Sequence, residues 1–155
     1  MNYKMSKIIN PGAEEILDKE YKCLDKGFVR LVDYMGGDHS IVQAARVSYG
    51  AGTKTVNEDR GLIRYLMRHL HTTPFEMVEL KFHVKLPIFV ARQFIRHRTA
   101  NVNEYSGRYS IMKDEFYVPN KDAIKFQSEK NKQGRADEEV PAELRQKIID
   151  ELRSE

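Results

Sequence analysis

The chain has 155 residues, of which 41% are hydrophobic and 32% charged, with a formal net charge of +3 at pH 7. The length predicts one domain over residues 1–155, or part of a larger one. Residues 1–23 are expected to be an N-terminal extension. No apolar run approaches the roughly 20 residues that cross a bilayer, and the small net charge is not that of a polyanion-binding protein, so we expect neither membrane nor nucleic-acid partners.

The first half of the chain alternates between strand and helix patterns. Residues 28–35 predict a strand that stops at a glycine pair, and Asp38 predicts the N-cap of a helix reaching about Tyr49. After a glycine-containing loop at 50–53, a second helix is expected from about 57 to 71. The apolar faces of the two helices would comprise Ile41, Val42, Ala44, Ala45 and Val47, then Leu62, Ile63, Leu66, Met67 and Leu70.

Strict alternation of apolar and polar residues over 78–86 predicts a strand with one buried face. Burial of a large apolar side chain contributes roughly 1.5–3 kcal/mol, so this strand is expected to anchor the core. Pro87 then predicts the first turn of a helix over 88–95, which leads directly into Arg96.

The C-terminal third is more polar. Residues 115–118 predict a short strand ended by Pro119, and the nearly apolar-free segment 127–139 predicts a mobile loop. Pro141 begins a helix whose apolar face has no later segment to cover it, so we expect further residues after Glu155 or a second subunit. The start of the chain has no apolar signal segment and the single cysteine cannot form an internal disulfide, which favours the cytoplasm.

Residues 96–110, RHRTANVNEYSGRYS, form a polar cluster that we call the arginine segment. It carries three arginines against Glu104 alone. A guanidinium is charged at any physiological pH and offers a planar fork of donors that matches phosphate or carboxylate. Together with the hydroxyl of Ser106 and the open backbone of Gly107, the segment predicts a site for a nucleotide. The alternative is a solvated helix end with loose salt bridges.

Other chemistries fit the sequence less well. The five histidines form no HExxH and no zinc-ligand spacing with cysteine, so we expect no metal. Ser106 does not lie in a nucleophile elbow, and Cys23 is far from the arginine segment in the sequence.

The arginine segment resembles the signature RHRxxSxNExSxRYS of the flavin-dependent thymidylate synthases (ThyX family). LDKGFVRLVDYMGGD, QAARVSYG, YLMRHLHTTPFE and FHVKLPIFVARQFIRHR also resemble the equivalent parts of that family. The likeness extends from Leu24 to Pro119 and implies a ThyX-like α+β fold in which an antiparallel sheet packs with helices. It also implies a homotetramer with shared sites that converts dUMP to dTMP, using methylenetetrahydrofolate as the one-carbon donor and FAD reduced by NADPH.

Site residues follow from the resemblance by matching position. Those implied to bind FAD are Ser48, His71, Thr73, Arg96, His97, Arg98 and Glu104. Those implied to bind dUMP are Gln93, Arg96, Glu104, Tyr105, Ser106, Gly107 and Arg108. Catalytic roles are assigned to Arg96, His71 and Ser106, with Ser106 expected to donate a hydrogen bond rather than to attack, since no nearby base in the sequence would activate it.

Plainer interpretations stand beside these assignments. His71 would simply end its helix, Thr73 would be extended loop before Pro74, and Ser48 is open either way. Asn101 replaces the serine of the signature, and the family's later asparagine-, arginine- and histidine-rich stretch has no counterpart here. The competing functions are a nucleotide- or RNA-binding module without chemistry and an inactive partial subunit.

Overall fold

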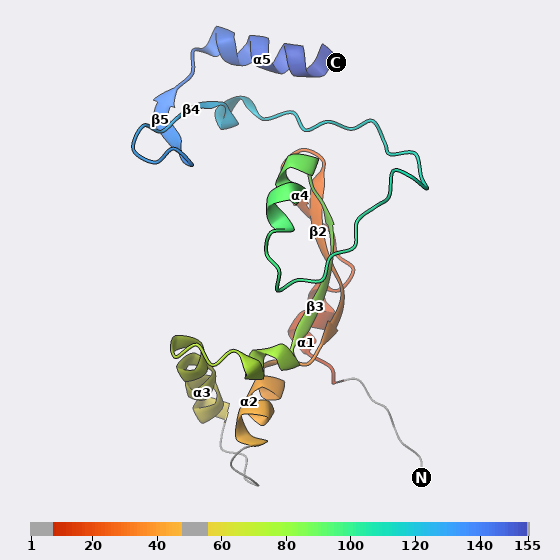
Figure 1. The fold of residues 1–155 in the computed structure, drawn as a ribbon, viewed down its shortest axis with the longest axis vertical. Coiled ribbons are helices and arrows are strands. Elements are labelled where there is room, and N and C mark those ends of the chain that lie inside the picture. The colour runs from red at the N-terminus through yellow and green to blue at the C-terminus, as the bar shows by residue number, and fades with distance from the viewer. Residues whose placement is uncertain (1–7, 48–55, 155) are drawn as a thin grey trace. The chain divides into compact units, whose positions relative to one another are not determined.

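The computed structural model describes residues 8–47 and 56–154. It is an α+β structure, as expected, with a sheet of order β1-β2-β3 and a separate antiparallel pair, β4-β5 (Figure 1). The chain divides into two compact units. The first holds the described residues up to Tyr21 together with Val29–Val84, and the second holds Lys22–Phe28 and the chain from Lys85 onward. Within the described ranges, no helix has the length and apolar character needed to span a membrane.

The described part of the predicted N-terminal extension is folded. Helix α1 (Pro11–Ile16) begins at Asn10, whose Oδ1 accepts the amide N–H groups of Gly12 and Ala13 at 3.1 and 3.3 Å. Tyr34, which is only 4% exposed, donates its hydroxyl to Glu14 at 2.5 Å and accepts the N–H of Asn10 at 3.0 Å. These bonds attach α1 to strand β2. A further short strand, β1, covers Tyr21–Cys23.

Strand β2 (Gly27–Met35) confirms the first predicted strand and leads into helix α2 (Asp38–Arg46). The helix is capped by Gly37 rather than by Asp38, and the Gly37 N–H donates to Ser40 Oγ at 3.2 Å. Ile41 and Val42 are buried as predicted. Val47, the C-cap of this helix, is 81% exposed, so the predicted apolar face does not extend to it. The predicted end at Tyr49 and the loop 50–53 lie outside the described residues.

Helix α3 (Val56–Arg68) lies beside α2, and Arg46 donates to Asp59 at 2.5 Å between them (Figure 1). Leu66 is buried, but Met67 and Leu70 are 62% and 82% exposed, so the predicted apolar stripe was too long. The helix also ends three residues before the predicted His71. The 3-10 helix η2 (Thr73–Met77) follows and packs against α2.

The early end of α3 has the geometry of a Schellman motif. The His71 N–H donates to Leu66 O at 2.9 Å, and the Leu70 N–H donates to Met67 O at 3.2 Å. This double closure requires a left-handed residue, and Leu70 takes that place with φ 57°. A branched side chain in this conformation is strained, so the turn ends the helix at a cost that glycine would avoid.

The predicted core role of strand β3 (Glu79–Lys85) was wrong. Leu80 and Phe82 alternate as expected but are 55% and 48% exposed. An apolar strand face is buried only where another layer covers it, and the described residues of this chain supply no such layer. Among the described residues of the first unit, the buried side chains are instead Leu31, Tyr34, Ile41, Val42 and Leu66.

In the second unit, helix α4 (Ile88–Phe94) begins after Pro87, as predicted. The segment 127–139, expected to be a loop, is largely part of a hairpin in which strand β4 (Lys125–Gln127) pairs with β5 (Arg135–Glu139). The short 3-10 helix η3 (Lys121–Ala123) precedes this hairpin. Its polar side chains are compatible with a strand because almost all of them remain exposed. Helix α5 (Ala142–Ser154) confirms the last predicted element, and Ile149 and Val140 are each 4% exposed.

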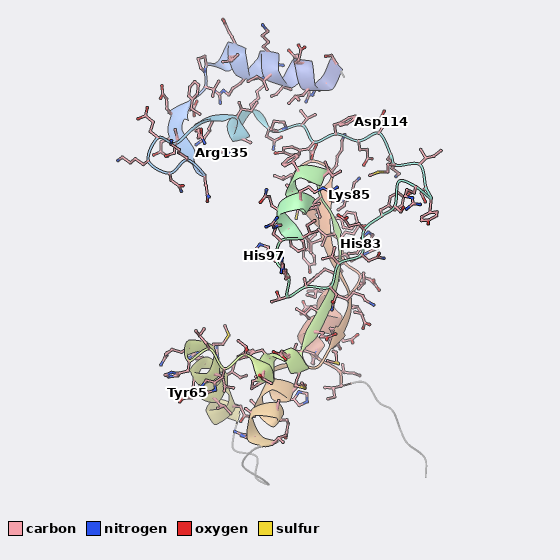
Figure 2. The ribbon with its side chains drawn as sticks, viewed as in Figure 1. Tyr65, His83, Lys85, His97, Asp114 and Arg135 are labelled. Carbon is pink, nitrogen blue, oxygen red and sulfur yellow. The ribbon has the colours of Figure 1, made fainter. Side chains whose placement is uncertain are left out.

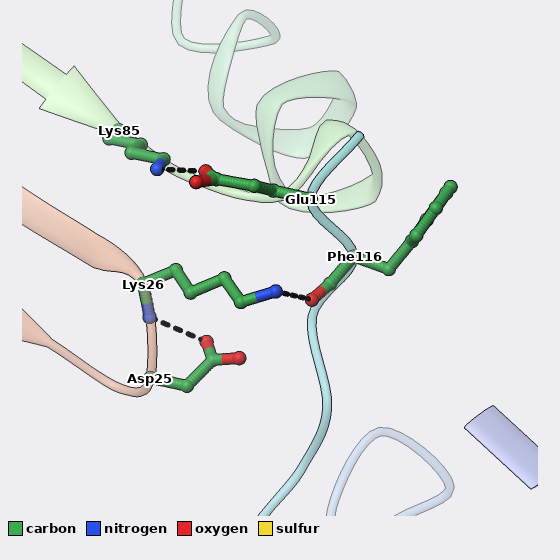
Figure 3. Close-up of polar contacts among 5 residues, drawn as sticks. All are labelled: Asp25, Lys26, Lys85, Glu115 and Phe116. Carbon is green, nitrogen blue, oxygen red and sulfur yellow. Dashed lines mark hydrogen bonds and ion pairs between the residues drawn. The ribbon is translucent and has the colours of Figure 1, made fainter. Parts of the chain in front are cut away.

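Residues 115–118 do not form the predicted strand. The backbone there has no partner strand within the described residues. Its Phe116 carbonyl accepts from Lys26 Nζ at 3.1 Å (Figure 3). Its Val118 N–H donates to Asp25 Oδ2 at 3.2 Å. Side chains thus satisfy the polar groups that a neighbouring strand would otherwise pair.

Two glycines allow a matched test of backbone constraint. Gly36 has φ 77°, and a Cβ there would lie 2.7 Å from Met77 O and 2.9 Å from Ser40 Oγ. We expect Gly36→Ala to lower the free energy of unfolding by more than about 1 kcal/mol. Gly61→Ala, inside α3 with nothing within 4 Å, should raise it by about 0.5–1 kcal/mol. Equilibrium urea unfolding measures both, and equal midpoints for the two variants would contradict the description of the Gly36 turn.

The strained end of α3 gives a second prediction. Leu70→Gly should raise the free energy of unfolding by about 0.5–1 kcal/mol, because the left-handed conformation is penalised only when a Cβ is present and little apolar contact is lost at an exposed residue. Leu144→Gly, in the first turns of α5, should instead lower it by about 1 kcal/mol. Thermal and urea unfolding of both variants decide this, and a destabilised Leu70→Gly protein would show that the side chain matters more than the turn.

Candidate functional site

The arginine segment starts where α4 ends. The helix closes with the Ile95 N–H donating to Ala91 O at 3.0 Å. The next two amides make shorter-range bonds, from Arg96 to Gln93 O at 3.2 Å and from His97 to Phe94 O at 3.1 Å. Gln93 therefore lies on the last helical turn, and Arg96 and His97 lie on the tighter turn that follows it. Figure 2 shows His97 where the chain leaves α4.

A second turn gathers the residues around Ser106. The Arg108 N–H donates to Ser106 Oγ at 3.3 Å, and the amides of Tyr109 and Ser110 donate to Ser106 O at 3.3 and 3.2 Å. Tyr105 closes the outer end of this turn by donating its hydroxyl to Ile111 O at 3.4 Å. The structure thus brings Tyr105, Ser106, Gly107 and Arg108 together within one turn.

The hydroxyl of Ser106 is half-buried and already accepts a backbone N–H. Its own proton remains available for donation. No carboxylate, imidazole or lysine of the described chain makes a hydrogen bond with Ser106 Oγ, so nothing in this turn would remove that proton. The arrangement suits a hydrogen-bond donor better than a nucleophile.

The charges of the arginine segment are exposed and unneutralised. Arg96, Arg98 and Arg108 are exposed, and none of them forms an ion pair within residues 8–47 and 56–154. By contrast, Arg46 contacts Asp59 at 2.5 Å and Arg145 contacts Glu139 at 3.2 Å. Exposed guanidinium groups of this kind leave their donors free for a phosphate or a carboxylate.

His71 and Thr73 belong to the first unit, whereas the arginine segment belongs to the second. His71 lies just beyond the end of α3. Its backbone N–H closes the Schellman turn that ends the helix. Its ring centroid is 6.2 Å from that of Tyr65, whose ring is in turn 4.3 Å from that of His69. Thr73 is exposed and begins η2.

Tyr65 and His69 were not among the predicted site residues. The signal was present in the sequence, because residues four apart on a helix lie on one face, and both belong to the stretch YLMRHLHTTPFE. Figure 2 marks Tyr65 on α3. Glu104 and Arg98 are exposed and make no hydrogen bond or ion pair within the described chain, and Ser48 lies outside it.

Comparison with known proteins agrees with the sequence resemblance. The family model described as "Thymidylate synthase complementing protein" matches residues 30–154. A flavin-dependent thymidylate synthase of Ehrlichia ruminantium (strain Gardel) is 69% identical over 129 residues, covering 83% of this chain and 43% of that protein. One from Rickettsia bellii (strain RML369-C) is 58% identical over 152 residues, covering 98% of this chain and 52% of its own length.

A solved structure is also similar. The UMP/dUMP methylase PolB from Streptomyces cacaoi, bound with 5-Br UMP, superposes with a TM-score of 0.70 at 33% identity, covering 85% of this chain and 55% of that one. The chain spans about half the length of the curated relatives it matches. The predicted family is confirmed by these matches: the chain belongs to the family of thymidylate synthase complementing proteins.

Proposed function

We propose that this chain provides the nucleotide-binding part of a flavin-dependent thymidylate synthase, which converts dUMP to dTMP. The observation that carries the proposal is the set of exposed guanidinium groups in the arginine segment, which form no ion pair within the described residues. Family membership supports the reaction, since relatives at 58–69% identity bear the name flavin-dependent thymidylate synthase. A UMP/dUMP methylase with a similar fold, solved with 5-Br UMP, supports the substrate.

The phosphate of dUMP would bind at the Ser106 turn. Arg108 supplies a charged fork there, and Ser106 supplies a hydroxyl proton. Gly107 has no side chain, which would let the ligand approach its backbone. A Cβ at that position would also lie 3.3 Å from Met112 Sδ. Arg96 and Gln93, on consecutive turns at the end of α4, would hold the pyrimidine, and Glu104 would accept from a ring N–H or a sugar hydroxyl.

The residues present fit a flavin dinucleotide. Its pyrophosphate needs cationic donors, and Arg96, His97 and Arg98 are exposed at the start of the arginine segment. Its ring system suits aromatic neighbours, and His71 lies beside Tyr65. Thr73, together with Ser48, would add hydroxyl groups. When bound, FAD would supply the reducing equivalents, taken from NADPH, while the protein orients the substrates and provides charge.

The one-carbon unit would come from methylenetetrahydrofolate. We propose a homotetramer with shared active sites, as the family resemblance implies. The exposed apolar residues of β3 are compatible with this assembly. A cytoplasmic location fits these substrates and the single cysteine.

Arg108→Ala tests the substrate site in the complete protein. Loss of a charge-assisted hydrogen bond should weaken dUMP binding by about tenfold to a hundredfold, measured by isothermal titration calorimetry. Arg153→Ala, at an exposed arginine of α5, is the control and should bind like the parent. Unchanged dUMP affinity in Arg108→Ala would contradict the assignment. If nucleic acids of any sequence displace dUMP and the affinity falls steeply with salt concentration, an RNA-binding module would be favoured instead.

Ser106→Ala tests the role of the hydroxyl. If Ser106 only donates a hydrogen bond, the variant should retain turnover at a rate reduced by no more than about a hundredfold. Tritium release from labelled dUMP, dependent on NADPH and the folate, measures this rate. Complete loss of activity together with a covalent pyrimidine adduct on the parent serine, seen by mass spectrometry, would show that Ser106 is a nucleophile.

A further inference from the structure

Four consecutive residues after the arginine segment are each held by a different contact. The Glu115 carboxylate accepts from Lys85 Nζ, and Phe116 O accepts from Lys26 Nζ at 3.1 Å (Figure 3). The Val118 N–H donates to Asp25 Oδ2 at 3.2 Å, while the Tyr117 ring lies 6.1 Å from that of Phe89 on α4. This short extended stretch is therefore more firmly placed than its lack of secondary structure suggests.

The backbone of Lys85, whose side chain contacts Glu115, is closely packed against the turn at Gly27. Lys85 is the last residue of β3, and two residues separate it from the start of α4. Its carbonyl oxygen would lie 3.0 Å from a Cβ built on Gly27. The same Cβ would be 2.6 Å from Cys23 O, so the absence of a side chain at Gly27 lets these backbones approach. The turn that carries Asp25 and Lys26 is thereby held next to the end of β3. Asp25 also accepts the Lys26 N–H at 2.8 Å, which orders its carboxylate.

Between these anchors the chain has only local support. Within the described part of the chain, every hydrogen bond of residues 97–114 joins residues no more than six apart in sequence. No ion pair fixes residues 97–114 within that same part. The position of the arginine segment therefore depends on its two ends, α4 on one side and residues 115–118 on the other.

We propose that Lys85 and Glu115, assisted by Lys26 and Asp25, act as positioning residues for the nucleotide site. We call these four residues the clasp. The Lys85–Glu115 ion pair joins the chain just before α4 to the chain just after the arginine segment, and so closes the loop that presents Arg96 and Arg108. The inference rests on the proposed function, because the ligand of that loop is taken to be dUMP.

The clasp contributes to ligand binding rather than to global stability. The two side chains of the ion pair remain 41% and 34% exposed, and pairs in such surroundings stabilise a fold little. Restricting the loop lowers the conformational entropy lost when a ligand orders it, which is a gain in affinity. The hydrogen bond from Lys85 holds the pKa of Glu115 below its ordinary value. Because that pKa is lowered, the ion pair is complete at neutral pH and is lost only as the pH falls through the lowered pKa.

The test uses the complete protein and three variants, namely Lys85→Met, Glu115→Ala and the charge reversal Lys85→Glu with Glu115→Lys. Each single variant should raise the Kd for dUMP by about twofold to fivefold, with little change in the urea midpoint. The reversed pair should recover most of the affinity, which a merely structural effect at either site would not produce. Hydrogen exchange at the amides of residues 106–118 should be faster in the single variants and restored in the reversed pair.

Glu139→Ala is the matched control, since it removes a comparable ion pair, with Arg145, from the same unit but away from the loop. It should leave both the Kd and the exchange rates unchanged. Unchanged affinity and exchange in both single variants, or a reversed pair no better than them, would overturn the clasp. If the parent protein itself fails to bind dUMP, the proposed function is contradicted, and the exchange rates alone then decide whether the clasp orders the loop.

Discussion

A guanidinium group cannot lose its charge at physiological pH, so an arginine must be balanced by a carboxylate, by water or by a bound anion. Elsewhere in this chain the first solution is used, as when Arg46 contacts Asp59. In the arginine segment, Arg96, Arg98 and Arg108 have no carboxylate partner within the described residues. The rest of the site follows from keeping these charges together without neutralising them. Helix α4 brings the first to the start of the loop, and the Ser106 turn places the last beside a free hydroxyl proton.

Positioning such charges is a problem for a loop that has no sheet or helix of its own. Here side chains make the hydrogen bonds to the loop backbone that the backbone of a neighbouring strand would make in a sheet. Asp25 and Lys26 satisfy the amide and carbonyl groups of residues 116–118, and Lys85 pairs with Glu115. The pKa values of Asp25 and Glu115 are both lowered. At Asp25, burial raises the pKa, but hydrogen bonds from backbone N–H groups, including that of Val118, outweigh it. At Glu115, the hydrogen bond from Lys85 is the main cause of the lower pKa. Both carboxylates therefore stay charged across the neutral range, and these contacts persist with them.

The residues assigned to the flavin are distributed over the two units of the chain. His71 and Thr73 follow a strained helix end in the first unit, where Leu70 occupies a left-handed position that would suit glycine. The left-handed turn at Leu70 sets the direction in which the chain leaves α3 toward His71. The neighbouring rings of Tyr65 and His69 give this part of the first unit an aromatic character.

Local pattern alone was enough to predict strands β2 and β3 and helices α4 and α5. Each of these depends on residues close in the sequence, through side-chain periodicity or a proline at a helix start. The anion-binding chemistry of the arginine segment was inferred in the same local way and stays a prediction. The family, too, could be recognised from the order of residues 96–110. The assignment of individual residues to FAD or dUMP came from that resemblance and stays a prediction.

Tertiary structure decided what depends on partners distant in the sequence. Leu80 and Phe82 alternate like core residues but are exposed, since burial requires a second layer and not only a pattern. Residues 115–118 have the composition of a strand, yet side chains some 30 to 90 positions away take up their polar groups instead. Polar residues of 135–139 pair with β4 because strand pairing uses the backbone, which composition does not report. Periodicity along the chain records which side of an element is apolar, whereas only the folded chain determines what, if anything, lies against that side.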